Sequence, residues 1–189
     1  MKYYYLLGTL CTLITVMGIT ATAKADVSIS VPAAEAINTD APQPQAASPT
    51  PKVVMNSSEL AIYNRVNEYR QSKNMLPLTI DPAISAQAKV HSERMARIGH
   101  ITHDGFNDRV ESVAQTIVYR SAAENVGYNV GYAQPEAIAV EDWVSSPGHQ
   151  KNMVGRYDLT GIGSAVNAKG EHYFTQIFIR KAYYVKDVD

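Results

Sequence analysis

Residues 160–180, TGIGSAVNAKGEHYFTQIFIR, decide the fold of this 189-residue chain. Two strand-like segments, residues 160–166 and 171–180, flank a four-residue loop that ends at Gly170, and this pattern predicts a β-hairpin. The second strand carries large apolar side chains in alternation on both faces: Tyr173, Ile177 and Ile179 on one, Phe174 and Phe178 on the other. A sheet that is apolar on both faces must be covered on both sides.

The first strand of this hairpin contains two glycines, Gly161 and Gly163. Glycine has no side chain to pack and weakens a strand interior, so its presence there indicates that another element approaches the backbone closely. We therefore expect a helix to lie against this strand.

The segment before the hairpin predicts helices. Ser57 or Ser58 can cap a first helix with apolar side chains at helical spacing. Asp81-Pro82 begins a second helix, because it combines a capping carboxylate with proline in the first turn, and Gly99 ends it. The side chains that this second helix should bury are spaced 4, 3, 4 and 3 residues apart: Ile84, Ala88, His91, Met95 and Ile98.

Two further helical segments are predicted. Residues 108–114 form a short amphipathic piece, and Gln134-Pro135-Glu136 opens a helix that reaches Trp143, a core residue. Residues 146–148, Ser-Pro-Gly, end that helix, and His149 begins a short turn. Helices followed by a hairpin predict an α+β fold, a three-layer α-β-α sandwich with a small antiparallel sheet.

Residues 1–25 resemble an export signal: Lys2, a short apolar run, and a small-x-small site at residues 23–25. An uncleaved anchor is the alternative. Cys11 is the only cysteine, and Leu10 before it argues against lipid attachment, so the mature chain would have no thiol. We expect a secreted or periplasmic protein that has no membrane span after cleavage of the signal.

Residues 26–56 contain five of the nine prolines and no aromatic residue, which is typical of an extended disordered linker. The folded domain is then expected over residues 57–185. A formal net charge of -1 excludes strong electrostatic attraction to nucleic acid. No glycine-rich phosphate loop is present.

Three separated polar residues offer chemistry: His103, Glu124 and His149. Each lies beside glycine, proline or an expected helix end, where side chains from distant parts of a chain can meet in a cleft. Two neutral imidazoles are good zinc ligands.

Five segments, in order, resemble the signature of the CAP superfamily, whose module is also called the SCP domain and which includes cysteine-rich secretory and pathogenesis-related proteins. They are Asn67-Glu68-Tyr69-Arg70, Ala123-Glu124-Asn125-Val126, Gly148-His149-Gln150-Lys151-Asn152-Met153, Gly161-Ile162-Gly163 and Tyr173-Phe174-Thr175-Gln176-Ile177-Phe178. The resemblance spans about residues 58–182 and, without cysteines, is closest to the bacterial branch.

The resemblance implies an α-β-α sandwich with a central cleft of two histidines and two acids, in which the histidines can bind zinc. His103, Glu124 and His149 match three of these four positions. The second acid should follow the tryptophan of the preceding helix, where this sequence has Ser145 and Ser146.

Glu124 has two alternative roles, and it is the one candidate for a catalytic group. It could complete a His₂Glu metal set like those of hydrolytic zinc sites. It could instead accept a hydrogen bond from a ligating imidazole and fix its tautomer. The expected cleft-lining residues are Glu124, Asn125, Ser146, Asn152 and Gln176.

The remaining histidines have other interpretations. His91 lies on an apolar helix face and is expected in the core, and His172 is expected to be solvated or paired. His100, three residues before His103, is a rival ligand. Tyr128 and Tyr132 flank glycines in an expected loop and could line the rim of a groove.

Two functions follow as hypotheses. The first is a secreted binding module with a metal-capable cleft and a lipid or protein ligand, which the resemblance favours because family members include such binders. The second is a metal-dependent hydrolase or peptidase of the envelope or medium; His-Glu-x-x-His and Gly-x-Ser-x-Gly are absent from the sequence. A purely structural envelope protein is a third possibility.

Overall fold

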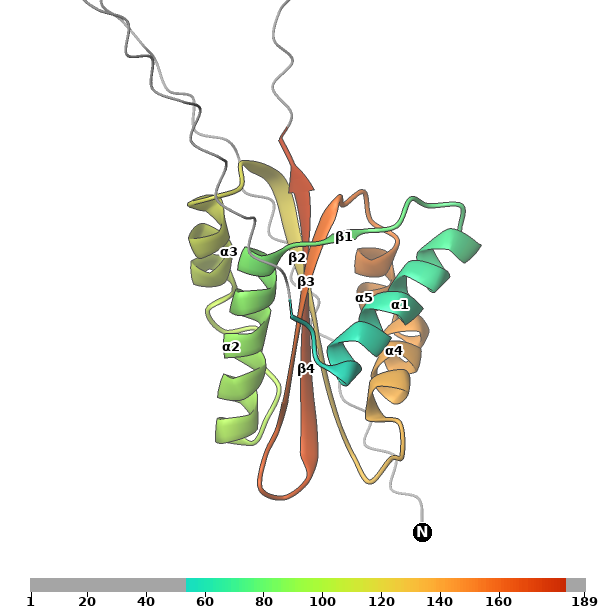
Figure 1. Cartoon of the computed structure of the whole chain (residues 1–189), viewed down its shortest axis with the longest axis vertical. Coiled ribbons are helices and arrows are strands. Elements are labelled where there is room, and N and C mark those ends of the chain that lie inside the picture. Colours follow the sequence, from blue (N-terminus) through green and yellow to red (C-terminus); the bar gives the residue numbers. More distant parts are fainter. Residues whose placement is uncertain (1–53, 183–189) are drawn as a thin grey trace, which may run out of the picture. The chain divides into compact units, whose positions relative to one another are not determined.

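A four-stranded sheet separates two layers of helices in the computed structural model, which describes residues 54–182 (Figure 1). Helices α2 and α3 cover one face of the sheet, and α1, α4 and α5 cover the other. In chain order the elements are α1 (Ser57–Ser72), β1 (Thr79–Ile80), α2 (Pro82–Ile98), α3 (Phe106–Ala114), β2 (Tyr119–Val130), α4 (Pro135–Ser145), α5 (Pro147–Met153), β3 (Leu159–Val166) and β4 (Glu171–Lys181).

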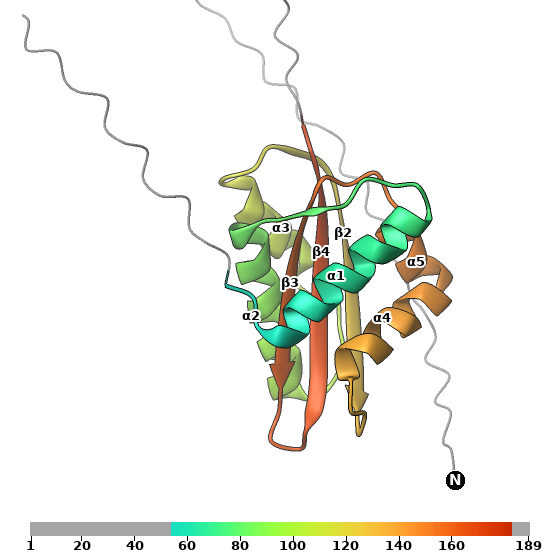
Figure 2. The ribbon, with the colours of Figure 1, turned by 45° about the vertical axis from the view of Figure 1, so that its right-hand side comes forward.

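The strands lie in the order β1-β3-β4-β2 (Figure 2). Strand β4 is antiparallel to both of its neighbours, and β1 pairs with β3 in parallel over two residues. The predicted α+β sandwich is therefore confirmed, and so is the hairpin. The short parallel pairing of β1 with β3 makes the sheet mixed rather than purely antiparallel. A strand of two residues has no sequence pattern from which this pairing could be predicted.

Strand β4 carries both cores, as its alternation predicted. Phe174 and Phe178 pack among side chains of α1, α4 and α5, including the buried Trp143. Ile177 and Ile179 pack on the opposite face against α2 and α3. All four β4 side chains have 0% exposure, so the strand is buried on both faces and positions both helical layers.

Helix α2 lies directly on the backbone of β3, which confirms the prediction from the two glycines. A Cβ atom added at Gly161 would lie 2.2 Å from the Ile84 carbonyl carbon. A Cβ atom added at Gly163 would lie 2.2 Å from the Lys89 backbone nitrogen. Only glycine permits this approach of the helix to the strand.

Helix α2 begins and ends as expected. The Asp81 side chain accepts hydrogen bonds from Ala83 N–H at 2.9 Å and Ile84 N–H at 3.1 Å. Gly99 ends the helix in the left-handed conformation at φ 75°. Ile98, which was expected in the core, is 41% exposed as the last residue of the helix, beside the Gly99 cap.

The cap of α1 was wrongly predicted. Asn56 holds the N-cap position instead of Ser57 or Ser58, and its side chain accepts from Glu59 N–H at 3.0 Å. The Glu59 carboxylate accepts from Asn56 N–H in return, so a capping box forms.

Strand β2 was not predicted. Its polar residues and the glycine of the segment from Asn125 to Gly127 are typical of a loop, and a loop was expected there. The strand runs for 12 residues and is held by pairing with β4, a long-range contact that local pattern does not reveal. His149 likewise lies inside a helix, α5, rather than at the start of a turn.

The expected signal at residues 1–25 and most of the expected linker at residues 26–56 lie outside the described residues. Among residues 54–182, no helix is long and apolar enough to cross a membrane.

Substituting Gly163→Ala should destabilise the fold, since the new methyl group overlaps the backbone of α2 at Lys89. Overpacking of this kind costs about 1–3 kcal/mol. Gly127→Ala is the matched comparison, because its methyl group would meet the Trp143 side chain at 3.3 Å rather than backbone. Denaturant unfolding should show the larger loss for Gly163→Ala; equal stability of Gly163→Ala and wild type would contradict the close approach.

Candidate functional site

Glu124 is the centre of a buried polar cluster. It lies on β2, and its side chain is 1% exposed. Arg109 of α3 binds the carboxylate through two nitrogens: Nε donates to Oε2 at 2.9 Å and a terminal nitrogen donates to Oε1 at 2.8 Å. This two-point contact fixes the carboxylate and neutralises its charge.

His103 binds the same carboxylate from the loop between α2 and α3. Its Nδ1 lies 2.9 Å from Glu124 Oε1. Because the carboxylate oxygen is an acceptor, Nδ1 carries the proton and Nε2 keeps its lone pair. The His103 side chain is 38% exposed, so this free nitrogen belongs to a ring that reaches the surface.

His149 reaches the same region from α5. Burial is the main cause that lowers the pKa of His149, and the electrostatic interaction with His103 lowers it further. The lowered pKa favours the neutral form of the His149 ring at pH 7. A neutral imidazole pair can bind a metal ion or accept hydrogen bonds.

His91 adjoins this cluster from the core side, where the sequence placed it. Its Nε2 lies 2.7 Å from the Thr102 carbonyl oxygen, to which it donates, and 4.0 Å from Glu124 Oε1. Burial is the main cause that lowers the pKa of His91. The hydrogen bond to Thr102 anchors the loop that carries His103.

Amides connect β2 to α5. Asn125 Nδ2 donates to the His149 carbonyl oxygen at 3.2 Å, and Asn152 Nδ2 donates to Asn125 Oδ1 at 2.9 Å. Asn152 also reaches the Glu124 carbonyl oxygen at 3.3 Å. These bonds hold the His149 backbone in place next to β2.

The other two expected cleft-lining residues lie apart from these amides. Gln176 is fully buried in β4 and donates to Thr160 Oγ1 at 3.1 Å. Ser146 precedes α5, and its buried Oγ has no partner among the described residues. The structure thus joins His103, Glu124, Asn125 and Asn152 through hydrogen bonds, and does not join Ser146 or Gln176 to them.

Sequence reasoning missed Arg109, the strongest partner of Glu124. The sequence pattern that could have revealed it is a charged residue at helical spacing from Val113, on the face of α3 that is buried. A lone cation on an apolar helix stripe indicates a buried anionic partner, since unpaired charges are rarely buried.

The hydrogen bonds of this polar cluster limit what it can hold. Residues 54–182 contain no group of three His, Cys, Asp or Glu side chains placed to hold a metal ion. Both Glu124 oxygens bond to Arg109, and one also bonds to His103. The carboxylate therefore fits the role that fixes an imidazole tautomer better than the role of a third metal ligand.

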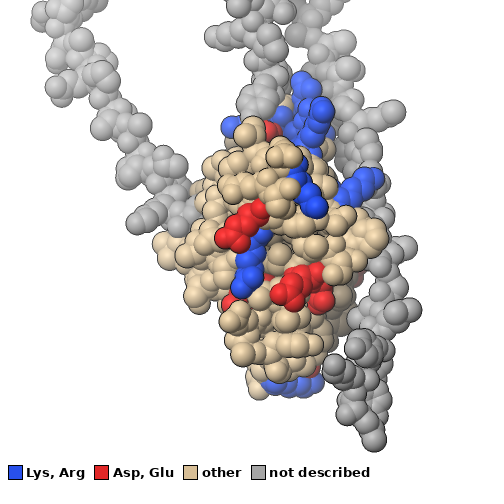
Figure 3. All heavy atoms as spheres, turned by 90° about the vertical axis from the view of Figure 1, so that its right-hand side faces the viewer, with Lys and Arg blue, Asp and Glu red and all other residues tan. Residues whose placement is uncertain are grey.

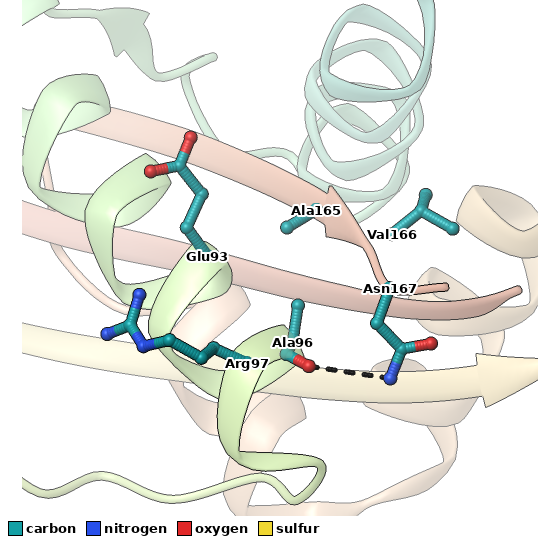
Figure 4. Close-up of a pocket in the computed structure, with 6 residues that line it drawn as sticks. All are labelled: Glu93, Ala96, Arg97, Ala165, Val166 and Asn167. Atoms are coloured by element: carbon teal, nitrogen blue, oxygen red, sulfur yellow. Dashed lines mark hydrogen bonds between the residues drawn. The ribbon is translucent and has the colours of Figure 1, made fainter. Parts of the chain in front are cut away.

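Two surface hollows lie elsewhere. One, of about 240 Å³, lies between the ends of α2 and β3 and is lined in part by Glu93, Arg97 and Asn167 (Figure 4). A second, of about 370 Å³, lies between α1 and α5. Neither is lined by His103, Glu124 or His149.

The family model for the cysteine-rich secretory protein family, CAP, matches residues 63–178. Two relatives from Bacillus subtilis (strain 168) are similar to the chain. The uncharacterized membrane protein YlbC is 31% identical over 135 residues, which cover 69% of this chain and 36% of YlbC. The uncharacterized protein YkwD is 30% identical over 172 residues, which cover 86% of this chain and 64% of YkwD. The chain thus spans less than two thirds of either relative.

One similar solved structure is an extracellular protein containing an SCP domain from Bacillus anthracis. It is 25% identical, with a TM-score of 0.55, over 66% of this chain and 40% of that one. The common part has the same fold as residues 54–182.

Replacing Arg109, the cation that binds Glu124, should lower the free energy of unfolding of the domain. Arg109→Met leaves a buried carboxylate without its charge partner, which costs about 3–5 kcal/mol. Arg94→Met is the matched control, because Arg94 shares the Asp104 carbonyl oxygen with Arg109 but has no bond to Glu124. The losses for Arg109→Met and Glu124→Leu should be strongly non-additive in the double variant; additive losses would contradict the pair.

Stability should fall as pH decreases below the ordinary histidine pKa of about 6.5. The folded pKa of His91 is lowered, so between the two pKa values the unfolded chain binds a proton that the folded chain refuses. The loss for one such group is at most about 1.4 kcal/mol per pH unit. His91→Gln keeps a donor for Thr102 and should show a shallower loss between pH 7 and 5 in denaturant unfolding; an identical slope would contradict the assignment.

Proposed function

Because the chain belongs to the cysteine-rich secretory protein (CAP) family, we propose that it acts outside the cytoplasm as a binding module whose cleft holds one divalent metal ion through His103 and His149. The observation that carries this proposal is the contact between His103 Nδ1 and Glu124 Oε1 at 2.9 Å. That contact directs the free Nε2 away from the carboxylate, and a hydrogen bond from Asn125 holds the backbone of His149 beside the same strand.

The chemistry of the two histidines suits zinc. Neutral imidazole nitrogens bind zinc at about 2.0–2.1 Å, and a carboxylate behind the ligating ring raises its basicity. His103 with Glu124 supplies this pair, while His149 supplies a second ring whose pKa already favours the neutral form. When bound, the ion would keep coordination positions for water or a ligand, since only two protein side chains reach it.

The same geometry argues against the hydrolase alternative. A hydrolytic zinc site of the His₂Glu type needs a carboxylate oxygen free for the metal, or a base next to the bound water. Glu124 is buried, and both of its oxygens are held by Arg109. Glu124 is therefore assigned as a residue that orients His103, and binding is the function that its environment supports.

We infer that loops around the cleft contact a lipid or protein ligand, with the sandwich as a rigid platform. The family membership supports an extracellular setting, and the similar protein from Bacillus anthracis is an extracellular protein. The face formed by α1, α4 and α5 shows acidic and basic side chains interspersed rather than one field of a single sign (Figure 3). Recognition there would depend on shape and apolar contact more than on charge.

Metal titration by calorimetry tests the proposal. Wild-type protein should bind about one zinc ion at neutral pH, and His103→Ala or His149→Ala should lose that binding. His100→Ala is the matched control, because His100 is exposed and lies three residues before His103. Binding should weaken below about pH 6.5, where protons compete for the imidazoles.

Two outcomes would contradict the proposal. One is equal zinc binding by wild type and both cleft variants. The other is peptide hydrolysis by the wild-type protein that is lost in a correctly folded Glu124→Gln variant. Such a loss would make Glu124 a catalytic group, whereas the proposal assigns it only to positioning His103.

A further inference from the structure

Two arginines lie next to each other at one end of the sheet. Arg120 is near the start of β2 and Arg180 is near the end of β4, and these two strand ends are neighbours (Figure 1). The paired residues there are Tyr119 with Lys181 and Ser121 with Arg180. Three consecutive residues of β2 thus lie opposite two residues of β4, which makes Arg120 the extra residue of a β-bulge.

The bulge gives Arg120 cationic neighbours. It lies between the positions opposite Lys181 and Arg180, so the residues across from it on β4 are both basic. Like charges that lie opposite each other on adjacent strands are destabilising. Bulges are frequent next to functional sites, where they redirect a side chain. The bulge at Arg120 therefore concentrates positive charge at this end of the sheet.

No carboxylate of residues 54–182 pairs with either arginine. Arg120 is exposed and Arg180 is partly exposed, and neither side chain forms an ion pair or a hydrogen bond with another described residue. Asp158, the residue before β3, uses a carboxylate oxygen to accept from the Lys181 amide at 2.8 Å. Arg109, by contrast, is bound at two points by Glu124. An anionic ligand would balance the charge that the described acidic side chains leave at Arg120 and Arg180.

The chemistry of this cluster suits a phosphomonoester. A guanidinium group binds phosphate oxygens through two parallel N–H donors. A phosphomonoester carries a charge of about −1.5 to −2 at pH 7, so it balances two guanidinium groups, whereas a carboxylate balances one. The Ser121 hydroxyl, which bonds to no other described residue, supplies a donor for a further oxygen. Cross-strand neighbours have Cβ atoms about 4.5–8 Å apart, which allows long side chains to meet at one group.

We propose that Arg120, Ser121 and Arg180 form an arginine site that binds a phosphomonoester group, carried by a soluble phosphate ester or by the headgroup of phosphatidic acid. The arginine site is separate from the polar cluster around Glu124, because Ser121 lies three residues, or about 10 Å, from Glu124 along β2. It goes beyond the proposed metal-binding function and does not depend on it.

An NMR titration of the exported protein with inorganic phosphate, at constant ionic strength, tests the proposal. The backbone amide signals of Arg120, Ser121 and Arg180 should shift in a saturable way, and acetate should shift them less. Arg120→Gln and Arg180→Gln should each weaken phosphate binding by about fivefold, since each removes one charged contact at an exposed site. Arg97→Gln is the matched control, because Arg97 is an exposed arginine of α2 with no ion pair among the described residues, and it should bind phosphate as wild type does.

A vesicle experiment identifies the source of the phosphate group. Phosphatidylcholine vesicles with and without phosphatidic acid are mixed with wild type and with the double variant of Arg120→Gln and Arg180→Gln. Binding that requires both phosphatidic acid and the two arginines assigns a lipid headgroup. Phosphate binding in solution, without binding to either kind of vesicle, assigns a soluble ester.

Three results would overturn the proposal: no saturable shift at the arginine site, shifts confined to other residues, or equal phosphate affinity in wild type and both single variants. The outcome is independent of the metal proposal. His103→Ala should bind phosphate as wild type does even though it should lose zinc, so a failure of one proposal is distinguishable from a failure of the other.

Discussion

The buried carboxylate of Glu124 is the interaction on which the site depends. An unpaired charge in this position would be costly, and Arg109 removes that cost with a two-point contact. The same pair joins α3 to the edge strand β2, and His103 adds the loop between α2 and α3. One ion pair therefore organises three segments and determines which imidazole nitrogen of His103 is free.

The sheet makes this arrangement possible. Strand β4 is apolar on both faces, so helices must cover both sides, and β2 beside it lies at a boundary between the two layers. The loop with His103 follows α2 on one side, and α5 with His149 packs with α4 on the other. The residues of the polar cluster meet at β2 because this strand contacts elements of both layers.

Local patterns predicted the parts of the fold that depend on local chemistry. Alternation revealed both faces of β4, Gly161 and Gly163 predicted the approach of α2, and Asp81 predicted its own cap. Strand β2 could not be predicted this way, because long-range pairing with β4 holds its polar residues in extended conformation. The three site residues were named from sequence and family resemblance, whereas Arg109 was not, since its role appears only when α3 packs against β2.

The tautomer of His103 tests the central claim most directly. Nitrogen-15 NMR of the imidazole rings at neutral pH distinguishes a protonated Nδ1 from a protonated Nε2. The account predicts that His103 carries its proton on Nδ1, donated to Glu124, and that Nε2 is the nitrogen whose signal moves when zinc is added. A proton on Nε2 in the metal-free protein, or a zinc-induced shift at Nδ1 instead, would contradict the account.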